Sequence, residues 1–382
     1  MSNTGSPKYF SNIRLMVRDP KLGPSDEFSF TMKDVTVAIT IANCLRRVIG
    51  LDIPTFTVSP ETISYAKNTS PWDPEMITHQ ISFIPMKPYF LKKADLNMLE
   101  LVLDVKNEEK AYRFVLSNEF TLKNKETNKV IPVDQIFIYD NLPLFLLGPR
   151  QQVTLSCQLE YNTKRDSDSK HQAGTAGIDY VEDEKNKDKD PDSILFNVNI
   201  QTGIGAKELI GLSFDNLIGR LRKLQEAIKT KDANLFYIQL NRYHRYDFVF
   251  IGEDHTMGSL IEKWNNRHDV RSVTGYRQTR DRKAITIDYG LNKFSPIIFT
   301  QNNAGDDDKL ENLIEKSVAS LDEKKEKEQR DSTVRIFTEN LLRIEQYFLE
   351  LKTDWNKTKV TNVPTKEYME SIHKKRMERL AR

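Results

Sequence analysis

Cysteine is scarce in this chain, with only Cys44 and Cys157 among 382 residues. Because no CxxC spacing occurs, the sequence excludes a disulfide framework and a cysteine-rich zinc site, and it favours a reducing compartment. The first ten residues, MSNTGSPKYF, hold no apolar segment, so we expect no secretory signal. No run approaches the roughly 20 apolar residues that cross a bilayer, so we expect no membrane partner.

An excess of charge of one sign is also lacking. Lys and Arg total 57 against 55 Asp and Glu, a net charge of +2. This balance excludes a uniformly basic coat for nucleic acid and leaves room only for a local basic patch. The 38% hydrophobic content excludes a wholly disordered chain, and the length allows two or three domains.

The sequence also lacks the familiar motifs of catalytic sites. The sequence contains no GxSxG and no HExxH, and no two of its six histidines stand four residues apart. TGIGAKE (202–208) places glycines before a lysine, but it lacks the spacing of a phosphate-binding loop, so we expect a strand-to-helix turn there. We therefore predict no catalytic residue, no metal and no cofactor.

The first half begins with a strand pattern. FSNIRLMV and EFSFTM alternate on either side of a Pro/Gly turn, which predicts a hairpin. Apolar residues at helical spacing then predict a helix with Asp34 as its N-cap and an end at Gly50 and Pro54. Several short β-like runs at 88–160 predict an inserted β-rich subdomain. The polar stretch 161–192 predicts a mobile loop around one short strand.

Two helices carry apolar residues at alternating steps of four and three, which is a heptad seam that favours pairing with another helix. The seam of the first, expected at 206–230, includes Ile210, Phe214, Leu217, Leu221 and Leu224. The seam of the second includes Val334, Phe337, Leu341, Ile344 and Phe348. The charged stretch Asp306–Asp331 is expected to continue the second helix.

The chain thus repeats one arrangement. A strand, an aspartate, a short amphipathic helix and further strands occur near residue 30 and again near residue 250, and each half ends in a heptad helix. We predict an α+β protein in which two similar halves form an intramolecular pseudo-dimer. The pattern alone leaves open a second interpretation, two unrelated α+β domains.

Residues 28–58, FSFTMKDVTVAITIANCLRRVIGLDIPTFTV, resemble the alpha-subunit family of multisubunit RNA polymerases. The family motif is an N-x-L-R-R helix followed by a turn, a proline and a strand. The matching residues here are Asn43, Leu45, Arg46, Arg47, Ile53 and Pro54. PEMITHQISFIP (74–85) is similar to the family's E-x-I-x-H-R-L-x-x-I-P segment, with Gln80 in place of the arginine.

The second half resembles the small alpha-like partner, the eleventh subunit of eukaryotic RNA polymerase II. EDHTMGSLI (253–261) is close to its E-D-H-T-L-G-N-L-L motif, and VTGYR (273–277) matches its V-x-x-A/G-G-Y-K strand. The family's next element, a His-Pro pair, is replaced by QTRDRK (278–283). The motif residues are Asp254, His255, Thr256, Gly258, Gly275 and Tyr276.

Eukaryotes and archaea keep these two subunits as separate chains. A fused chain resembles the subunit of nucleocytoplasmic large DNA viruses of the mimivirus, asfarvirus and poxvirus kind. The resemblance implies five parts in the chain. They are a large alpha-like dimerisation domain at 1–87 and 161–230, the insert at 88–160, a linker at 231–245, a small alpha-like dimerisation domain at 246–355 and a basic tail at 356–382.

The resemblance implies a non-catalytic assembly platform of a DNA-directed RNA polymerase. Its partners would be the largest and second-largest subunits and small polymerase subunits, with nucleic acid reached only through the complex. Its location would be the virion and the viral factory in the host cytoplasm, or the nucleus. The family assigns to the second-largest subunit a face made by Asn43, Arg46, Arg47, His79, Gln80, Phe83, Ile84 and Pro85.

Two further expectations concern the second half. Asp254 and Thr256 are expected to cap a helix, and Gly258 to allow close backbone packing. The rival function is a free-standing nucleic-acid-binding transcription regulator, favoured by the basic end Lys374–Arg382 and the charge-rich stretch 302–333.

Overall fold

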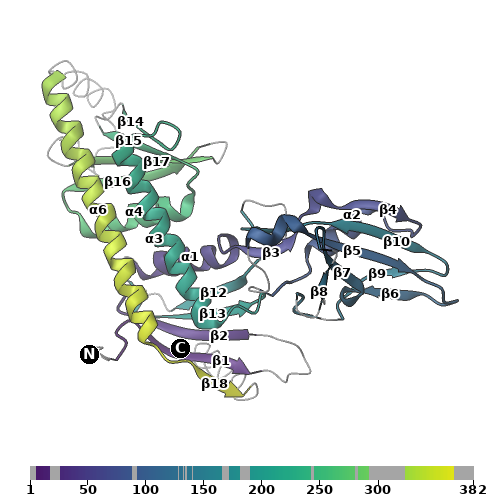
Figure 1. The fold of residues 1–382 in the computed structure, drawn as a ribbon. Helices are drawn as coiled ribbons and strands as arrows, with labels where there is room; N and C mark the ends of the chain where they lie inside the picture. Colours follow the sequence, from purple (N-terminus) through teal and green to yellow (C-terminus); the bar gives the residue numbers. More distant parts are fainter. Residues whose placement is uncertain are drawn as a thin grey trace, which may run out of the picture.

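The computed structural model describes residues 6–17, 26–87, 93–127, 129–131, 133, 136–139, 141–165, 172–180, 190–241, 245–279, 283–291 and 323–364. Figure 1 shows a body, which contains two sheets and the long helices α3 (Ala206–Thr230) and α6 (Glu323–Lys357), and an arm of strands that extends to one side. One hydrophobic cluster fills the body and a second fills the arm.

The first sheet of the body is built mainly from the first half of the chain. Its strand order is β12 (Gly174–Tyr180), β13 (Ser193–Ile200), β2 (Asp26–Lys33), β1 (Phe10–Val17) and β18 (Thr361–Pro364). β1 and β2 pair in antiparallel fashion, as predicted, and the predicted Pro/Gly turn between them, at residues 18–25, lies outside the described residues. Within the predicted polar stretch 161–192, β12 is the central strand, and residues 166–171 and 181–189 lie outside the described residues.

The second sheet has the order β14 (Phe236–Leu240), β15 (Tyr246–Ile251), β17 (Ala284–Leu291) and β16 (Ser272–Gln278). Helix α4 (His255–His268) packs on β16 and β17. The sequence assigned residues 231–245 to a linker, but β14 within it pairs with β15. The buried Phe236 lies against Phe248 and Phe250 in the core of the body, whereas Tyr237, Gln239 and Leu240 of the same strand are exposed.

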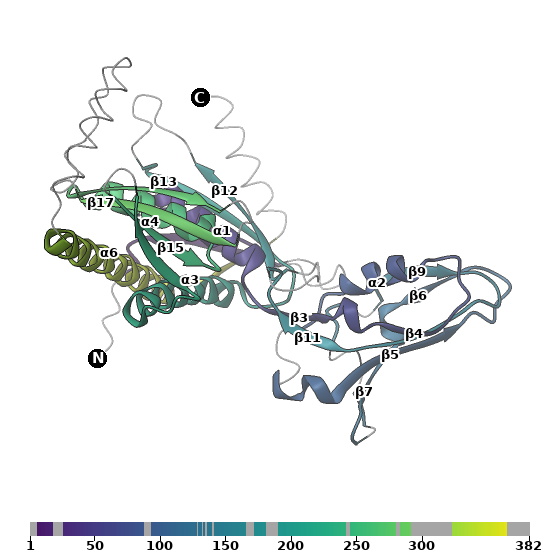
Figure 2. The ribbon, with the colours of Figure 1, turned by 90° about the horizontal axis from the view of Figure 1, so that it is seen from above.

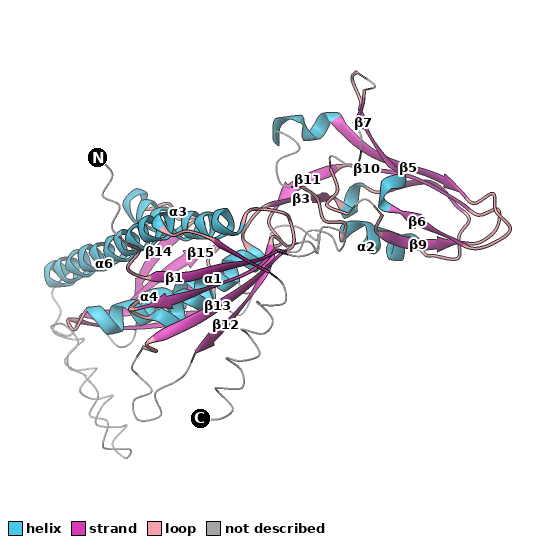
Figure 3. Ribbon diagram, turned by 90° about the horizontal axis from the view of Figure 1, so that it is seen from below, coloured by secondary structure: helices cyan, strands magenta, loops and turns pink. Residues whose placement is uncertain are grey.

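The arm contains a five-stranded sheet in the order β4 (Ser64–Asn68), β10 (Gln152–Cys157), β5 (Leu99–Lys106), β7 (Phe120–Asn124) and β8 (Val130–Ile131). A two-stranded sheet of β6 (Arg113–Leu116) and β9 (Pro143–Leu147) and helix α2 (Pro74–Ser82) complete it. Figure 3 shows that the paired strands β3 (Thr55–Val58) and β11 (Leu159–Asn162) join it to the body.

The arm begins earlier in the chain than the sequence suggested. The insert was expected to start at residue 88, yet Phe56, Val58 and Ile77 already belong to the hydrophobic cluster of the arm. The strand and helix patterns at 55–82 fit equally well in the hydrophobic cluster of the body or in that of the arm. Only the tertiary contacts show that these residues belong to the arm. We therefore define the arm as residues 55–162 and the body as the rest of the described chain.

Helices α3 and α6 pack along each other in the body, as Figure 2 shows from above. The bounds of α3 confirm the expected helix at 206–230. The seam side chains are buried, apart from the half-buried Val334, and Phe214 meets Phe348 with ring centroids 6.3 Å apart. For the predicted helix at Asp306–Asp331, residues 323–331 are helical and 306–322 lie outside the described residues.

Helix α6 packs against both sheets of the body. Near its middle, Phe337 stacks on Phe248 of the second sheet with centroids 4.2 Å apart. Near its end, the fully buried Trp355 lies 4.9 Å from Phe30 of the first sheet, and its indole N–H donates to the Lys207 carbonyl over 2.9 Å. The two sheets are therefore held to one shared hydrophobic core.

The chain after α6 returns to the first sheet. A basic tail was expected from residue 356, but residues 361–364 form β18, which pairs in parallel with β1. The Lys207 ammonium donates to the carbonyls of Asn356 and Thr358, which fixes the exit of α6 beside that sheet. A four-residue strand of sequence TNVP has too little apolar alternation to be seen in the sequence, and residues 365–382 lie outside the described part.

Helix α1 (Ala38–Leu51) is not capped by Asp34, contrary to expectation. The backbone N–H groups of Val37 and Ala38 donate instead to the Asp190 carboxylate over 2.9 and 3.0 Å. Val37 holds a left-handed conformation with φ of 46°, which is rare for a β-branched residue. A cap that comes from about 150 residues further along the chain leaves no local sequence signal.

Candidate assembly interface

Three arginines and three carboxylates gather where α1, α3, α4 and the base of the arm meet. We call them the arginine–carboxylate cluster; they are Arg47, Asp52, Arg165, Arg220, Glu253 and Asp254. The arginines and Asp52 come from the first half of the chain, whereas Glu253 and Asp254 precede α4 in the second half. The cluster therefore joins the two halves.

Arg220 of α3 lies at the centre of the cluster. Its Nη1 atom is 3.2 Å from Asp52 Oδ2 and its Nη2 atom is 2.8 Å from Asp254 Oδ1. Its Nε atom donates to Glu253 Oε2 over 3.0 Å, and its Nη2 atom also pairs with that carboxylate. One guanidinium group thus links three carboxylates, a use that suits its planar set of donors.

Arg165 and Arg47 approach Asp254 from other directions. Arg165 Nη1 is 2.8 Å from Asp254 Oδ2, and Arg165 Nε is 2.6 Å from Asp52 Oδ1. Arg47 Nη2 is 3.1 Å from Asp254 Oδ2, and Arg47 Nε donates to the Thr256 hydroxyl over 2.7 Å. The formal charges in the cluster cancel, as a buried group of charges requires.

Burial and charge act against each other at the carboxylates. Burial alone would raise the pKa of Asp254, but the guanidinium groups of Arg220 and Arg165 outweigh it and hold that pKa well below its usual range. At Glu253 burial prevails over the attraction of Arg220, so its pKa is raised. Desolvation opposes the charge of Arg220, yet the carboxylates of Glu253 and Asp254 raise its pKa. The cluster thus keeps Asp254 ionised.

The start of α4 depends on the same aspartate. Asp254 is the N-cap residue, as predicted, and its carboxylate accepts the Thr256 backbone N–H over 3.0 Å. Thr256 is not itself the cap; it is the second helical residue, and its hydroxyl donates to Asp254 over 3.1 Å. The exposed ring of His255 lies edge-on to Tyr276, with centroids 5.8 Å apart.

The two motif glycines differ in their surroundings. A Cβ atom on Gly258 would come within 2.9 Å of the ring of Tyr276 on β16, so the expected close approach of helix and strand exists. A Cβ atom on Gly275 would meet nothing within 4 Å. A larger side chain would therefore clash at Gly258 but not at Gly275.

The residues expected at the large-subunit face lie in two separate places. Asn43, Arg46 and Arg47 are on α1 in the body, whereas His79 and Gln80 are on α2 in the arm. Arg47 is committed to the internal cluster. Arg46 donates to Asn43 Oδ1 over 3.2 Å and, among the described residues, has no carboxylate partner.

On α2 and in the residues that follow it, only part of the expected set faces solvent. His79 and Gln80 are exposed, and Phe83 is 43% exposed and packs edge-on against the His79 ring. Ile84, by contrast, is 1% exposed within the hydrophobic cluster of the arm, and Pro85 is half-buried. Ile84 therefore supports the surface from beneath and is not part of it.

Sequence reasoning missed several residues. Asp52, Arg165, Arg220 and Glu253 received no role of their own, because their partners are far away along the chain. The adjacent acids of the EDHT motif were the available signal, since two neighbouring carboxylates ahead of a helix need cationic partners when buried. Met76, 49% exposed on α2, was also missed.

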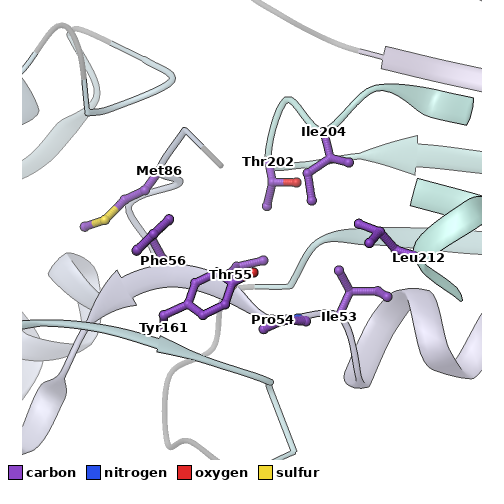
Figure 4. A pocket seen from close by; sticks show the side chains of 9 residues that line it. All are labelled: Ile53, Pro54, Thr55, Phe56, Met86, Tyr161, Thr202, Ile204 and Leu212. Carbon is purple, nitrogen blue, oxygen red and sulfur yellow. The ribbon is translucent and has the colours of Figure 1, made fainter. Parts of the chain in front are cut away.

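A small hollow of about 50 Å³ lies at the junction of arm and body, and Figure 4 shows its lining. The lining comes from both parts, and nearly all of it is apolar. The residues are Ile53, Pro54, Thr55, Phe56, Met86, Tyr161, Thr202, Ile204 and Leu212. A space of this size is too small for a cofactor.

Within the described ranges, no three His, Cys, Asp or Glu side chains gather so that they could hold a metal ion. None of the helices in the described part of the chain is long and apolar enough to cross a membrane.

Comparison with known proteins gives one informative relationship. No family model matches the chain. The chain is similar to the DNA-directed RNA polymerase subunit Rpo3 of the archaeon Methanocaldococcus jannaschii, with 25% identity over 133 residues. The match covers 35% of this chain and 59% of the archaeal protein, so the chain spans about three fifths of that relative. The chain is thus a distant relative of an archaeal alpha-like polymerase subunit, and its mixed α+β architecture fits that class.

Proposed function

We propose that this chain is a non-catalytic subunit of a multisubunit DNA-directed RNA polymerase and that it serves as an assembly platform for the two large catalytic subunits. The observation that carries the proposal is the similarity to archaeal Rpo3. The N-x-L-R-R residues on α1 and the motif residues at the start of α4 support it from the sequence.

The proposal includes a fused pair of alpha-like folds. Two observations support an intramolecular pseudo-dimer: α3 packs on α6, and α1 packs on α4, so the helices of the two halves meet in corresponding pairs. The arginine–carboxylate cluster supplies polar contacts across the same boundary. Fusion would hold the effective concentration of the second half high and fixed.

The viral origin is a finer part of the proposal and rests on the sequence resemblance alone. Both alpha-like motifs stand in one chain, in the order expected of a nucleocytoplasmic large DNA virus subunit. Action in the virion and in the viral factory of the host cytoplasm would follow from that origin. A tagged chain followed by microscopy in infected cells tests the location independently of the assembly role.

We place the contact with the second-largest subunit on two surfaces. One is the α1 face with Arg46 and Asn43, where the Arg46 guanidinium group has no carboxylate partner among the described residues. The other is the exposed face of α2 with Met76, His79 and Phe83. Exposed aromatic and arginine side chains are typical of the centres of protein interfaces.

A tagged pull-down from expressing or infected cells tests the proposal. Mass spectrometry is expected to find two large subunits in amounts equal to this chain, and the eluate should support non-specific transcription. Recovery of the chain alone, with DNA binding that weakens steeply with salt, would overturn the proposal in favour of the free-standing regulator.

A further inference from the structure

The arm is joined to the body by two adjacent chain crossings. The chain leaves the body after Asp52, at the end of α1, and returns through β11 to Arg165. Arg165 Nε lies 2.6 Å from Asp52 Oδ1, and the Arg165 backbone N–H donates to the Leu51 carbonyl over 3.2 Å. A charge-assisted bond thus ties the outgoing crossing to the returning one.

The same arginine reaches the second half of the chain. Arg165 Nη1 is 2.8 Å from Asp254 Oδ2, and Asp254 is the N-cap of α4. The Asp52 and Asp254 side chains are 7% and 9% exposed, whereas Arg165 is 32% exposed. The base of the arm is therefore bonded to a buried residue of the opposite half, by a side chain that can be replaced without opening the core.

Packing at the junction of arm and body is incomplete. The hollow between Phe56 and Tyr161 on the arm side and Ile204 and Leu212 on the body side is not filled by side chains. Close-packed interfaces resist rotation, and a junction with a hollow resists it less. The orientation of the arm therefore depends more on polar bonds at the two chain crossings, and less on apolar packing, than it would in a close-packed junction.

We propose that Arg165 is a clasp that fixes the direction of the arm, and that the clasp closes only when the second half is docked. Asp52 alone would hold the two crossings together within the first half. The bond to Asp254 adds a fixed point on the second half, so the arm takes one direction relative to the body when α4 is in place. Arm orientation is thereby coupled to the pairing of the two halves, whatever the partners of the protein are.

The test measures the distance between arm and body in the full chain. Cysteines replace the exposed Lys123 on β7 and the exposed Gln346 on α6, and a dye pair on them reports single-molecule energy transfer. Cys44 and Cys157 are 2% and 1% exposed, and burial raises the pKa of each thiol to about 12, so neither should take up label.

Arg165→Met is expected to broaden the distance distribution about twofold or to add a second population, as expected for a released hinge. Arg113→Met is the matched control: Arg113 is also 32% exposed and pairs with Glu119 within the arm, 2.6 Å away, so its loss should leave the distribution unchanged. Arg165→Lys should restore part of the narrow distribution. A wild-type distribution for Arg165→Met would overturn the clasp.

Asp254→Asn tests the coupling to the second half. Asparagine keeps the N-cap acceptor but removes the charge, so α4 should remain folded while the distribution broadens. Circular dichroism checks that helix content is kept. A folded Asp254→Asn protein with the narrow distribution would show that Asp52 alone holds the arm and would refute the coupling. Both measurements use the isolated chain, so their outcome is independent of any polymerase assembly.

Discussion

The Arg220 Nη2 atom lies 2.8 Å from Asp254 Oδ1, which joins α3 of the first half to the first turn of α4 in the second. Both side chains are about nine-tenths buried, with exposures of 12% and 9%. A buried charge pair is weak evidence of net stabilisation, but removal of one partner leaves the other charge buried and unpaired. This contact therefore makes the pairing of the halves sensitive to single substitutions.

Arg220→Met is expected to lower the free energy of unfolding by about 3–5 kcal/mol, because Glu253 and Asp254 lose their shared cation. Urea denaturation measures the change. Lys229→Met, in the last turn of the same helix, removes a 79% exposed lysine paired with a 63% exposed Glu226 and should cost about 1 kcal/mol or less. Equal losses for the two variants would contradict the central place of Arg220.

Gly258→Ala is expected to destabilise the protein, although alanine is the better helix former, because its Cβ atom would overlap the Tyr276 ring. Gly219→Ala on α3 is the control, since a Cβ atom there meets nothing within 4 Å and the change should be neutral or stabilising. Thermal unfolding of both variants decides the matter. If Gly258→Ala melted above the wild type, close helix–strand packing would not be the reason for that glycine.

A second buried network predicts a pH dependence. Asp269 accepts hydrogen bonds from Asn340 Nδ2 over 2.8 Å and from the Tyr289 hydroxyl over 3.2 Å, and it pairs with Arg271 over 2.8 Å. Burial alone would raise the pKa of Asp269, but the bonds from Arg271 and Asn340 outweigh it and lower the pKa to about 2. The ionised form is therefore the one that stabilises the fold.

Because the folded pKa lies below the unfolded value of about 3.9, the contribution of Asp269 is present above about pH 4 and is lost as the pH falls toward 2. The stability difference between the wild type and Asp269→Asn should be constant near neutral pH and shrink across that acid range. Denaturation series at several pH values measure it. A difference that does not vary with pH would exclude the charge of Asp269 as the cause.

Arg46→Ala is expected to weaken recovery of the second-largest polymerase subunit by about tenfold while the melting temperature stays within a few degrees, as for loss of an interface arginine. The exposed Arg343 on α6 provides the matched control, Arg343→Ala, which should change neither quantity. Undiminished recovery with Arg46→Ala would remove the α1 face from the proposed contact.

Local patterns predicted much of the fold. The antiparallel β1–β2 pair and the bounds of α3 follow from the two-residue and heptad periods, which depend only on neighbours in the chain. Asp254 as the N-cap of α4 follows from the same kind of signal. Features that depend on distant residues were missed, such as the Asp190 cap of α1 and the return of β18 to the first sheet.

The candidate site also combines features that the sequence could predict with features that only the folded chain shows. The position of α1 was predictable, but the different environments of Arg46 and Arg47 were not, because only the folded chain places Asp254 beside Arg47. Ile84 was assigned to a surface because it belongs to a linear motif, whereas burial in the arm follows from contacts with strands far along the chain. Motifs therefore pointed to the candidate residues, and tertiary contacts determine which of their side chains are exposed.

Native mass spectrometry of the complex purified through this chain tests the platform role most directly. We predict one copy of the chain with one copy of each large subunit and no separate small alpha-like chain, because in the proposed fused arrangement the second half would occupy that place on α3 and α1. A complex that contains a separate small alpha-like subunit, or a chain that binds neither large subunit, would contradict the account.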